Sequence, residues 1–274
     1  MRIEIKRRGV VIGCCALFAM AGIAVPPTAY GAYLSDNFES DTADVVPTSV
    51  TGTASGPTYE VKVVNSTTTP TDPFAASGNQ SLMLRDQDGS VSSAAWWTGA
   101  SGGLQSGNFS TQFQLDPVLS TASPDQPYAY TVIALGNDLS SGGAGIGGSA
   151  AAMVDIISYD GASPGSIRPN LNASPTSTVA LGVVHTLTIH FDVGTKTYSV
   201  TLDGTPLTDG SNNNVFPFYQ DVPNVDSVAV AAGWSSTNGV QVFYDNLNLS
   251  AVPEPASLAL LGLSVAALML KRRV

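Results

Sequence analysis

Hydrophobic and polar residues alternate with a period of two through much of the chain between residues 32 and 250. In the segment 186–193 every second side chain is apolar and those between are polar, and 197–203 repeats the pattern. This alternation indicates a β-strand with one face on a core and the other in water. The link at Gly194-Thr195 predicts that the two strands form an antiparallel hairpin, and Asp203-Gly204 begins the next turn.

Nine further segments have the composition and length of strands: 33–38, 59–64, 81–85, 91–97, 109–115, 128–135, 153–159, 225–232 and 240–249. No stretch of this region shows helical periodicity over a useful length, and turn-rich segments at 66–79, 140–149 and 209–214 separate the strands. Many short strands punctuated in this way favour an all-β fold, a two-sheet antiparallel sandwich or jelly roll. We expect residues 32–251 to form one such ectodomain.

The first 31 residues have the pattern of a secretory signal peptide. Basic residues end at Arg8, an uncharged apolar run covers 10–25, and Ala29 and Gly31 precede a cleavage site at Ala32. Two alternatives remain: an uncleaved anchor helix, and a lipoprotein signal with its cleavage box at 11–14. The apolar run is short for a bilayer span, which favours the cleaved signal peptide.

A second targeting signal occupies residues 252–274. It consists of three parts in order: the motif Val252, Pro253, Glu254 and Pro255, the uncharged apolar stretch 256–270, and the basic end Lys271, Arg272 and Arg273. The apolar stretch predicts a transmembrane helix, and the basic end is expected to stay in the cytoplasm.

The order of these three parts resembles the PEP-CTERM sorting signal of Gram-negative bacteria. The resemblance implies a precursor anchored in the inner membrane, processing by an exosortase near the Pro-Glu-Pro motif, and delivery to the cell surface or extracellular matrix. A plain tail anchor is the alternative.

Charge is distributed unevenly along the chain. Of the 11 Lys and Arg residues, four lie before residue 9 and three after residue 270, so only four remain in the ectodomain. Nineteen of the 21 acidic residues lie there, which gives the ectodomain a net charge of about −15. Such a body repels nucleic acid and anionic lipid, and it suits divalent cations. Both cysteines, Cys14 and Cys15, precede the ectodomain, so no disulfide stabilises it.

The run 185–204 carries a second resemblance. It looks like the penultimate hairpin of concanavalin-like and laminin-G-like jelly rolls, in which the second strand ends in Asp-Gly. The segments 36–39 and 243–247 are similar to the paired first and last strands of carbohydrate-binding jelly rolls. In those proteins a structural calcium joins acids of the two strands, which implies Asp36, Glu39 and Asp245 as ligands here. These acids could equally be solvated strand ends.

Catalytic constellations are not apparent in the sequence. Glycoside hydrolysis needs two carboxylates at a fixed separation, but the Glu-x-Asp-x-x-Glu motif of laminarinase-type jelly rolls is missing, and the ectodomain has only Glu39 and Glu60. The only histidines, His185 and His190, accompany no Gly-x-Ser-x-Gly nucleophile motif. We expect both histidines to be polar surface residues and the protein not to be an enzyme.

Sugar binding uses flat aromatic side chains, for which Trp96, Trp97 and Trp234 are the candidates. Adjacent Trp96 and Trp97 must point to opposite faces of a strand, and aromatic residues in sandwiches are more often core residues. The sequence favours a non-enzymatic exported surface or exopolysaccharide-matrix protein with a lectin-like sandwich, which binds extracellular polysaccharide and no nucleic acid. An extracellular polysaccharide hydrolase and a ligand-free structural coat protein are the alternatives.

Overall fold

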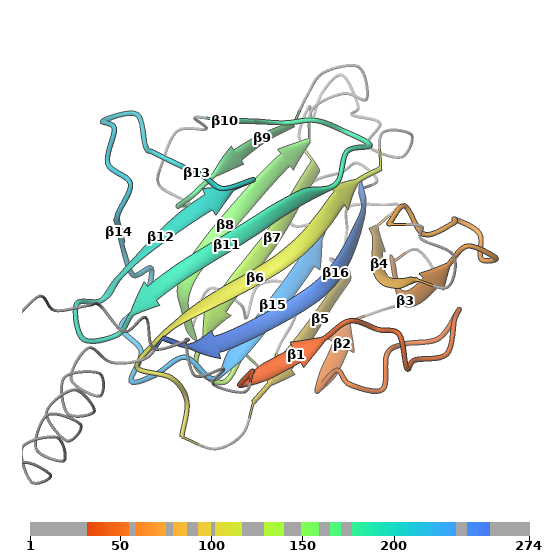
Figure 1. The fold of residues 1–274 in the computed structure, drawn as a ribbon, viewed down its shortest axis with the longest axis horizontal. Coiled ribbons are helices and arrows are strands. Elements are labelled where there is room, and N and C mark those ends of the chain that lie inside the picture. Colours follow the sequence, from red (N-terminus) through yellow and green to blue (C-terminus); the bar gives the residue numbers. More distant parts are fainter. Residues whose placement is uncertain are drawn as a thin grey trace, which may run out of the picture.

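The computed structural model describes residues 32–54, 59–74, 79–86, 93–99, 102–116, 129–139, 149–158, 165–170, 177–233 and 240–252. All the elements named within these residues are β-strands. They form two antiparallel sheets that pack face to face as a sandwich (Figure 1). The all-β, two-sheet fold expected from the alternation is confirmed.

The first sheet is built around the long strands β6, β11 and β16. Its order is β13 (Thr205–Pro206), β12 (Thr197–Leu202), β11 (His185–Asp192), β6 (Ser106–Leu115), β16 (Val240–Ala251), β4 (Gln80–Asp86) and β3 (Tyr59–Asn65). Two short strands add to it: β1 (Leu34–Asp36) pairs with β16, and β14 (Phe216–Pro217) pairs with β12.

The second sheet lies behind the first in Figure 1. Its order is β10 (Ser177–Val179), β9 (Gly165–Arg168), β8 (Ala150–Ser158), β7 (Ala129–Gly136), β15 (Ser227–Ala232), β5 (Ser93–Thr98) and β2 (Gly52–Ala54).

The main core fills the space between the two sheets. On β11 the inward side chains Leu187, Ile189 and Phe191 are fully buried, and Phe109 and Phe113 of β6 pack in the same cluster. Burial of each such side chain contributes roughly 1.5–3 kcal/mol. A second apolar cluster lies on the opposite side of the second sheet, and most of its buried members are alanines. The members are Ala94, Val132, Ala134, Leu139, Ala150, Met153, Ala229 and Ala231.

All eleven expected strands are present, with their ends within three residues of the expected positions. The hairpin of β11 and β12 has the expected antiparallel register, with Leu187 opposite Leu202 and Asp192 opposite Thr197. The five strands that were not expected, β2, β9, β10, β13 and β14, have two to four residues each. That length is too short for a period of two to be visible in the sequence.

The two terminal targeting segments, 1–31 and 252–274, lie outside the described residues except for Val252. Among the described residues, no helix has the length and apolar character that a membrane crossing requires. The helices expected at 10–25 and 256–270 therefore stay predictions.

Candidate functional site

The candidate acidic residues lie near the point at which β16 exchanges one neighbouring strand for another. Residues 240–244 of β16 pair with β4, whereas 247–249 pair with β1 on the same side. Between them the register with β6 shifts, and Asn246 adopts a left-handed backbone conformation with φ of 53°. Such a bulge re-aims side chains and leaves backbone groups without strand partners. The resulting junction brings the segment after β1 and the segment before β4 against the middle of β16.

Hydrogen bonds tie these segments to one another. The backbone N–H of Gln80 donates to Glu39 Oε1 at 3.0 Å, and the Gln80 side chain donates to the Glu39 carbonyl at 3.1 Å. The neighbouring Asn79 donates through Nδ2 to Asp245 Oδ2 at 3.2 Å. Glu39 and Asp245, expected from the sequence to lie together, are thus held by two consecutive residues.

Asp245 is 2% exposed and accepts hydrogen bonds from three groups. Besides Asn79, the backbone N–H of Asn246 donates to Oδ1 at 2.7 Å, and Asn246 Nδ2 donates to Oδ2 at 3.0 Å. Burial raises the pKa of Asp245 above its ordinary value, and the negative charges of Asp72 and Glu39 raise it further. The hydrogen bonds oppose this rise without cancelling it.

Asp72 forms an acidic cluster with Asp245 and Glu39, and it is the member of the cluster that the sequence analysis missed. It is 3% exposed, and its Oδ1 accepts hydrogen bonds from the Phe74 backbone and the Ser81 hydroxyl, both at 2.9 Å. Its Oδ2 is buried and has no hydrogen-bond partner among the residues that the structure describes. Burial raises the pKa of Asp72, with a further contribution from Glu39.

An apolar contact places Asp72 there. Phe74, two residues later, packs on Val64, Met83 and Phe243, a small cluster from β3, β4 and β16 that is separate from the main core. The chain after β3 therefore folds over these strands and carries Asp72 beside Asp245. Thr71-Asp72-Pro73 looks like ordinary turn chemistry in the sequence, so no local signal distinguishes Asp72 from other turn acids.

Buried carboxylates that raise each other's pKa are the environment that a bound cation would relieve. The buried Oδ2 of Asp72, which no described residue contacts through a hydrogen bond, fits such a role. Within the described residues, however, no three Asp, Glu, His or Cys side chains are grouped so that they could hold one metal ion. Carboxylates alone do not complete a site here.

Asp36, the third residue expected in the calcium site, has different partners. Its Oδ1 accepts the backbone N–H of Phe38 at 2.9 Å, and its Oδ2 accepts the indole Nε1–H of Trp97 at 3.1 Å and the Ser49 hydroxyl. Because Trp97 lies on β5 and Asp36 on β1, this carboxylate joins the two sheets.

The tryptophans divide as their adjacency predicted. Trp97 is 2% exposed and belongs to the main core, which makes it unavailable for stacking on an external sugar. Trp96 points to the opposite side of the second sheet and is partly exposed. Its ring lies so close over Gly52 that a Cβ there would be 2.3 Å from a ring carbon. Trp234 lies outside the described residues.

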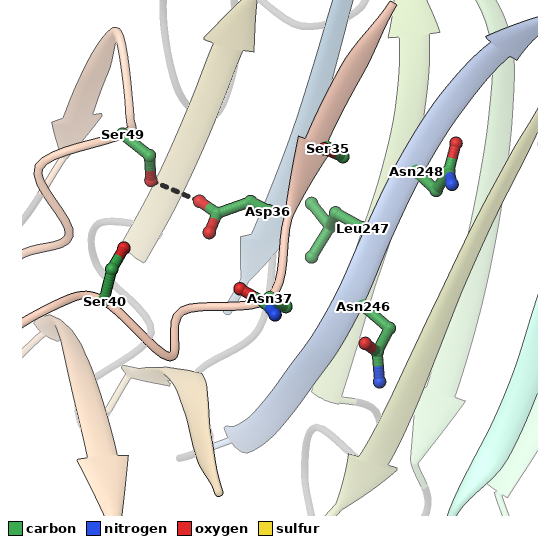
Figure 2. A pocket seen from close by; sticks show the side chains of 8 residues that line it. All are labelled: Ser35, Asp36, Asn37, Ser40, Ser49, Asn246, Leu247 and Asn248. Carbon is green, nitrogen blue, oxygen red and sulfur yellow. Dashed lines mark hydrogen bonds between the residues drawn. The ribbon is translucent and has the colours of Figure 1, made fainter. Parts of the chain in front are cut away.

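A polar pocket of about 390 Å³ lies beside Asp36, on the β1 side of the junction. Figure 2 shows its lining, which comes from β1, the segment that follows it, and β16. The lining side chains are Ser35, Asp36, Asn37, Ser40, Ser49, Asn246, Leu247 and Asn248. Seven of these eight side chains are hydroxyls, amides or a carboxylate, and no Lys, Arg or aromatic residue is among them.

The expectation that both histidines are surface residues is wrong for His185. Its side chain is only 9% exposed, with Nδ1 2.7 Å from Asp203 Oδ2 and Nε2 3.2 Å from the Ala180 carbonyl oxygen. Burial alone would raise the pKa of Asp203, but hydrogen bonds from His185 and Thr186 lower it. His190 is exposed as expected, with Nδ1 2.9 Å from Asn108 Oδ1.

At the end of β16, the backbone N–H of Val252 donates to the Ser106 carbonyl at 3.4 Å, and the sorting signal begins there. Residues 251–273 match the PEP-CTERM protein-sorting motif. The PEP-CTERM signal indicates an exported protein that is sorted through membrane-associated processing by an exosortase. Pro253, Glu254, Pro255 and the basic end Lys271, Arg272 and Arg273 lie outside the described residues.

No curated protein matches the chain in sequence. In structure, the chain is similar to a sialidase with a TM-score of 0.55 and 10% identity, over 83% of this chain and 19% of that one. It is also similar to a carbohydrate esterase of Shiga toxin-encoding bacteriophage phi24B, with a TM-score of 0.50 and 16% identity, over 80% of this chain and 98% of that one. The cellulose-induced protein Cip1 has a TM-score of 0.47 and 14% identity, over 80% of this chain and 98% of Cip1.

The chain therefore spans only about a fifth of the sialidase's length. At identities of this size the likeness shows the fold alone, because one sandwich fold hosts many unrelated functions.

Proposed function

We propose that this protein is a non-enzymatic component of the cell surface or exopolysaccharide matrix, and that its lectin-like sandwich associates with extracellular polysaccharide. The observation that carries the proposal is a row of short polar side chains across five strands of the first sheet. Thr201 of β12 lies opposite Thr188 of β11, which lies opposite Ser110 of β6. Ser110 lies opposite Asn248 of β16, and Asn248 lies opposite Ser35 of β1.

All five side chains of this row are at least partly exposed. Neighbouring strands lie about 4.8 Å apart, so the row extends over roughly 19 Å. Hydroxyl and amide groups both donate and accept hydrogen bonds, which matches the hydroxyl groups of a sugar chain. Charged side chains, which would favour an ionic partner, do not interrupt it.

The positions of the acidic residues also favour binding over hydrolysis. A glycosidase holds two carboxyl groups on either side of the scissile bond. Here Glu39 Oε1 accepts a hydrogen bond from the backbone N–H of Gln80, and Glu60 Oε2 lies 3.8 Å from Arg85 Nη1. Asp72 is 3% exposed and Asp245 is 2% exposed, so neither presents its carboxylate to an external sugar chain.

We further propose that calcium binds at the acidic cluster. Asp72 and Asp245 would supply carboxylate oxygens, Glu39 would lie beside them, and carbonyl, amide and water oxygens would complete the shell of a hard cation. The ion would neutralise the buried charges and hold the segments after β1 and β3 against β16.

The proposed route of the protein to the surface follows from the parts of its sorting signal. The apolar stretch 256–270 and its basic end anchor a precursor in the inner membrane. The exosortase cleaves near Pro253–Pro255, and the ectodomain is delivered to the surface or matrix of a Gram-negative cell.

Two assays on the full chain test the function. In the first, purified protein in a detergent without a sugar headgroup is applied to a glycan array. In the second, the protein is incubated with the bound polysaccharide, and new reducing ends or unsaturated products are measured. Binding without product formation is expected. Product formation would identify an enzyme, and an array without binding would leave a structural coat protein.

A further inference from the structure

The polar row on the first sheet ends at β1, and the polar pocket lies at that end. Ser35 and Asn248, the last two residues of the row, both line the pocket. Its volume of about 390 Å³ is within the range of sites that accept small molecules. The pocket thus extends the row into a concave site.

Much of the hydrogen-bonding capacity of the lining is unused. Within the described part of the chain, the side chains of Ser35, Ser40 and Asn248 make no hydrogen bond, and Asn37 uses only its Oδ1, in a long 3.4 Å contact from Glu39 N–H. Ser35 lies on β1, Asn37 and Ser40 lie on the segment that follows it, and Asn248 lies on β16 opposite Ser35 (Figure 2).

Asp36 gives the pocket a fixed acceptor. Phe38, Trp97 and Ser49 all donate to its carboxylate, so its orientation is set by the fold before any ligand arrives. A carboxylate has about four acceptor positions, and three donors leave one for a ligand hydroxyl. A group that is held in place in advance loses little freedom on binding.

The charge of the lining selects the ligand. Asp36 is the one charged side chain among the eight lining residues, so an anionic sugar such as a uronate would meet a carboxylate and no cation. The lining also lacks an aromatic ring, so a sugar would bind through its hydroxyl edge. We propose that this pocket binds a hexose residue of a neutral polysaccharide whose chain continues along the polar row. The inference rests on the proposed function and names its ligand class and subsite.

Calorimetric titration of the full chain tests the inference, with dextran and mannan as neutral ligands and alginate as the anionic one. Ser35→Ala and Asn248→Ala should each weaken binding of a neutral polysaccharide roughly 3- to 10-fold, the effect of losing one hydrogen bond. Thr178→Ala removes an exposed hydroxyl from β10 of the other sheet and is the matched control. The affinity of Thr178→Ala for the neutral polysaccharide should equal that of the unmodified chain. Equal melting temperatures establish that the variants are folded.

The possible outcomes separate this inference from the proposed function. A roughly 3- to 10-fold weakening of neutral-polysaccharide binding in both pocket variants, with the control unchanged, supports the subsite. Unchanged binding in the pocket variants together with loss in Thr188→Ala would overturn the subsite and leave polysaccharide binding on the sheet. Alginate bound as tightly as dextran or mannan would overturn the selection for neutral sugars. If the unmodified chain binds none of the polysaccharides, both proposals fail.

Discussion

The hydrogen bond between Trp97 and Asp36 offers a sharp test of how the two sheets are joined. The indole Nε1–H lies 3.1 Å from Asp36 Oδ2, and Trp97 is 2% exposed. A hydrogen bond to a charged acceptor contributes about 1.5–3 kcal/mol, and a buried donor without a partner adds a desolvation cost. Asp36→Ala should therefore lower the free energy of unfolding by at least 1.5–3 kcal/mol, which corresponds to roughly 3–12 °C in melting temperature.

Asp36→Ala also removes the contacts with Phe38 N–H and the Ser49 hydroxyl, so a double-mutant cycle is needed to isolate the tryptophan. Trp97→Phe removes the indole donor and keeps an aromatic ring in the core. In that background Asp36→Ala should cost about 1.5–3 kcal/mol less than in the unmodified chain. The assay is chemical denaturation of the four proteins, followed by circular dichroism. If the costs of Asp36→Ala and Trp97→Phe add to the cost of the double variant within about 0.5 kcal/mol, the hydrogen bond between the two residues does not stabilise the fold.

Three further predictions concern the metal, the pH dependence and the processing. Calcium at one hundred times its Kd should stabilise the chain by about 2.7 kcal/mol, roughly 5–11 °C in melting temperature, and Glu39→Gln or Asp245→Asn should abolish most of that gain; equal melting temperatures in calcium and in EDTA would contradict the metal site. Burial raises the pKa of Asp155 from 3.8 to about 6 despite its ion pair with Arg168, so the folded chain holds a proton that the unfolded chain releases. The free energy of unfolding should accordingly fall as pH rises from about 4 to 6, and thermal melts of Asp155→Asn should not show this fall. An equally steep fall in that variant would show that a group other than Asp155 causes it. Mass spectrometry of the surface form should find no peptide from residue 256 onward, whereas recovery of Lys271–Val274 would exclude cleavage.

Much of the secondary structure could be predicted because a period of two is a local property. The hairpin of β11 and β12 follows from the alternation together with the short link at Gly194-Thr195, and the division of Trp96 and Trp97 between two faces follows from the alternation. The same rule contained an unused signal: His185 shares the parity of Leu187 and Ile189, so the alternation already placed it on the buried face. A polar residue type favours the surface and the strand parity favours the core, and the parity decides here because Asp203 and the Ala180 carbonyl contact the two ring nitrogens.

The composition of the acidic cluster could not be predicted in the same way. Glu39 and Asp245 were expected from a resemblance of the terminal strands, but Asp72 lies in a turn-like segment without a distinguishing pattern. Its position depends on Phe74, which packs on an apolar cluster drawn from three strands. Asp36, although only three residues from Glu39, points instead to a donor on the other sheet.

The sequence by itself determined the β-strand character of the ectodomain, its strongly acidic charge and its sorting signal, because each depends on residue types over short stretches. Apart from the hairpin of β11 and β12, only the tertiary structure decided which strands are neighbours, since backbone hydrogen bonds are the same for every strand pair and carry no label of their partner. The choice of β4 and then β1 as neighbours of β16 created the junction. That choice buried Asp72 with Asp245, aimed Asp36 at Trp97, and left the polar pocket beside Asp36.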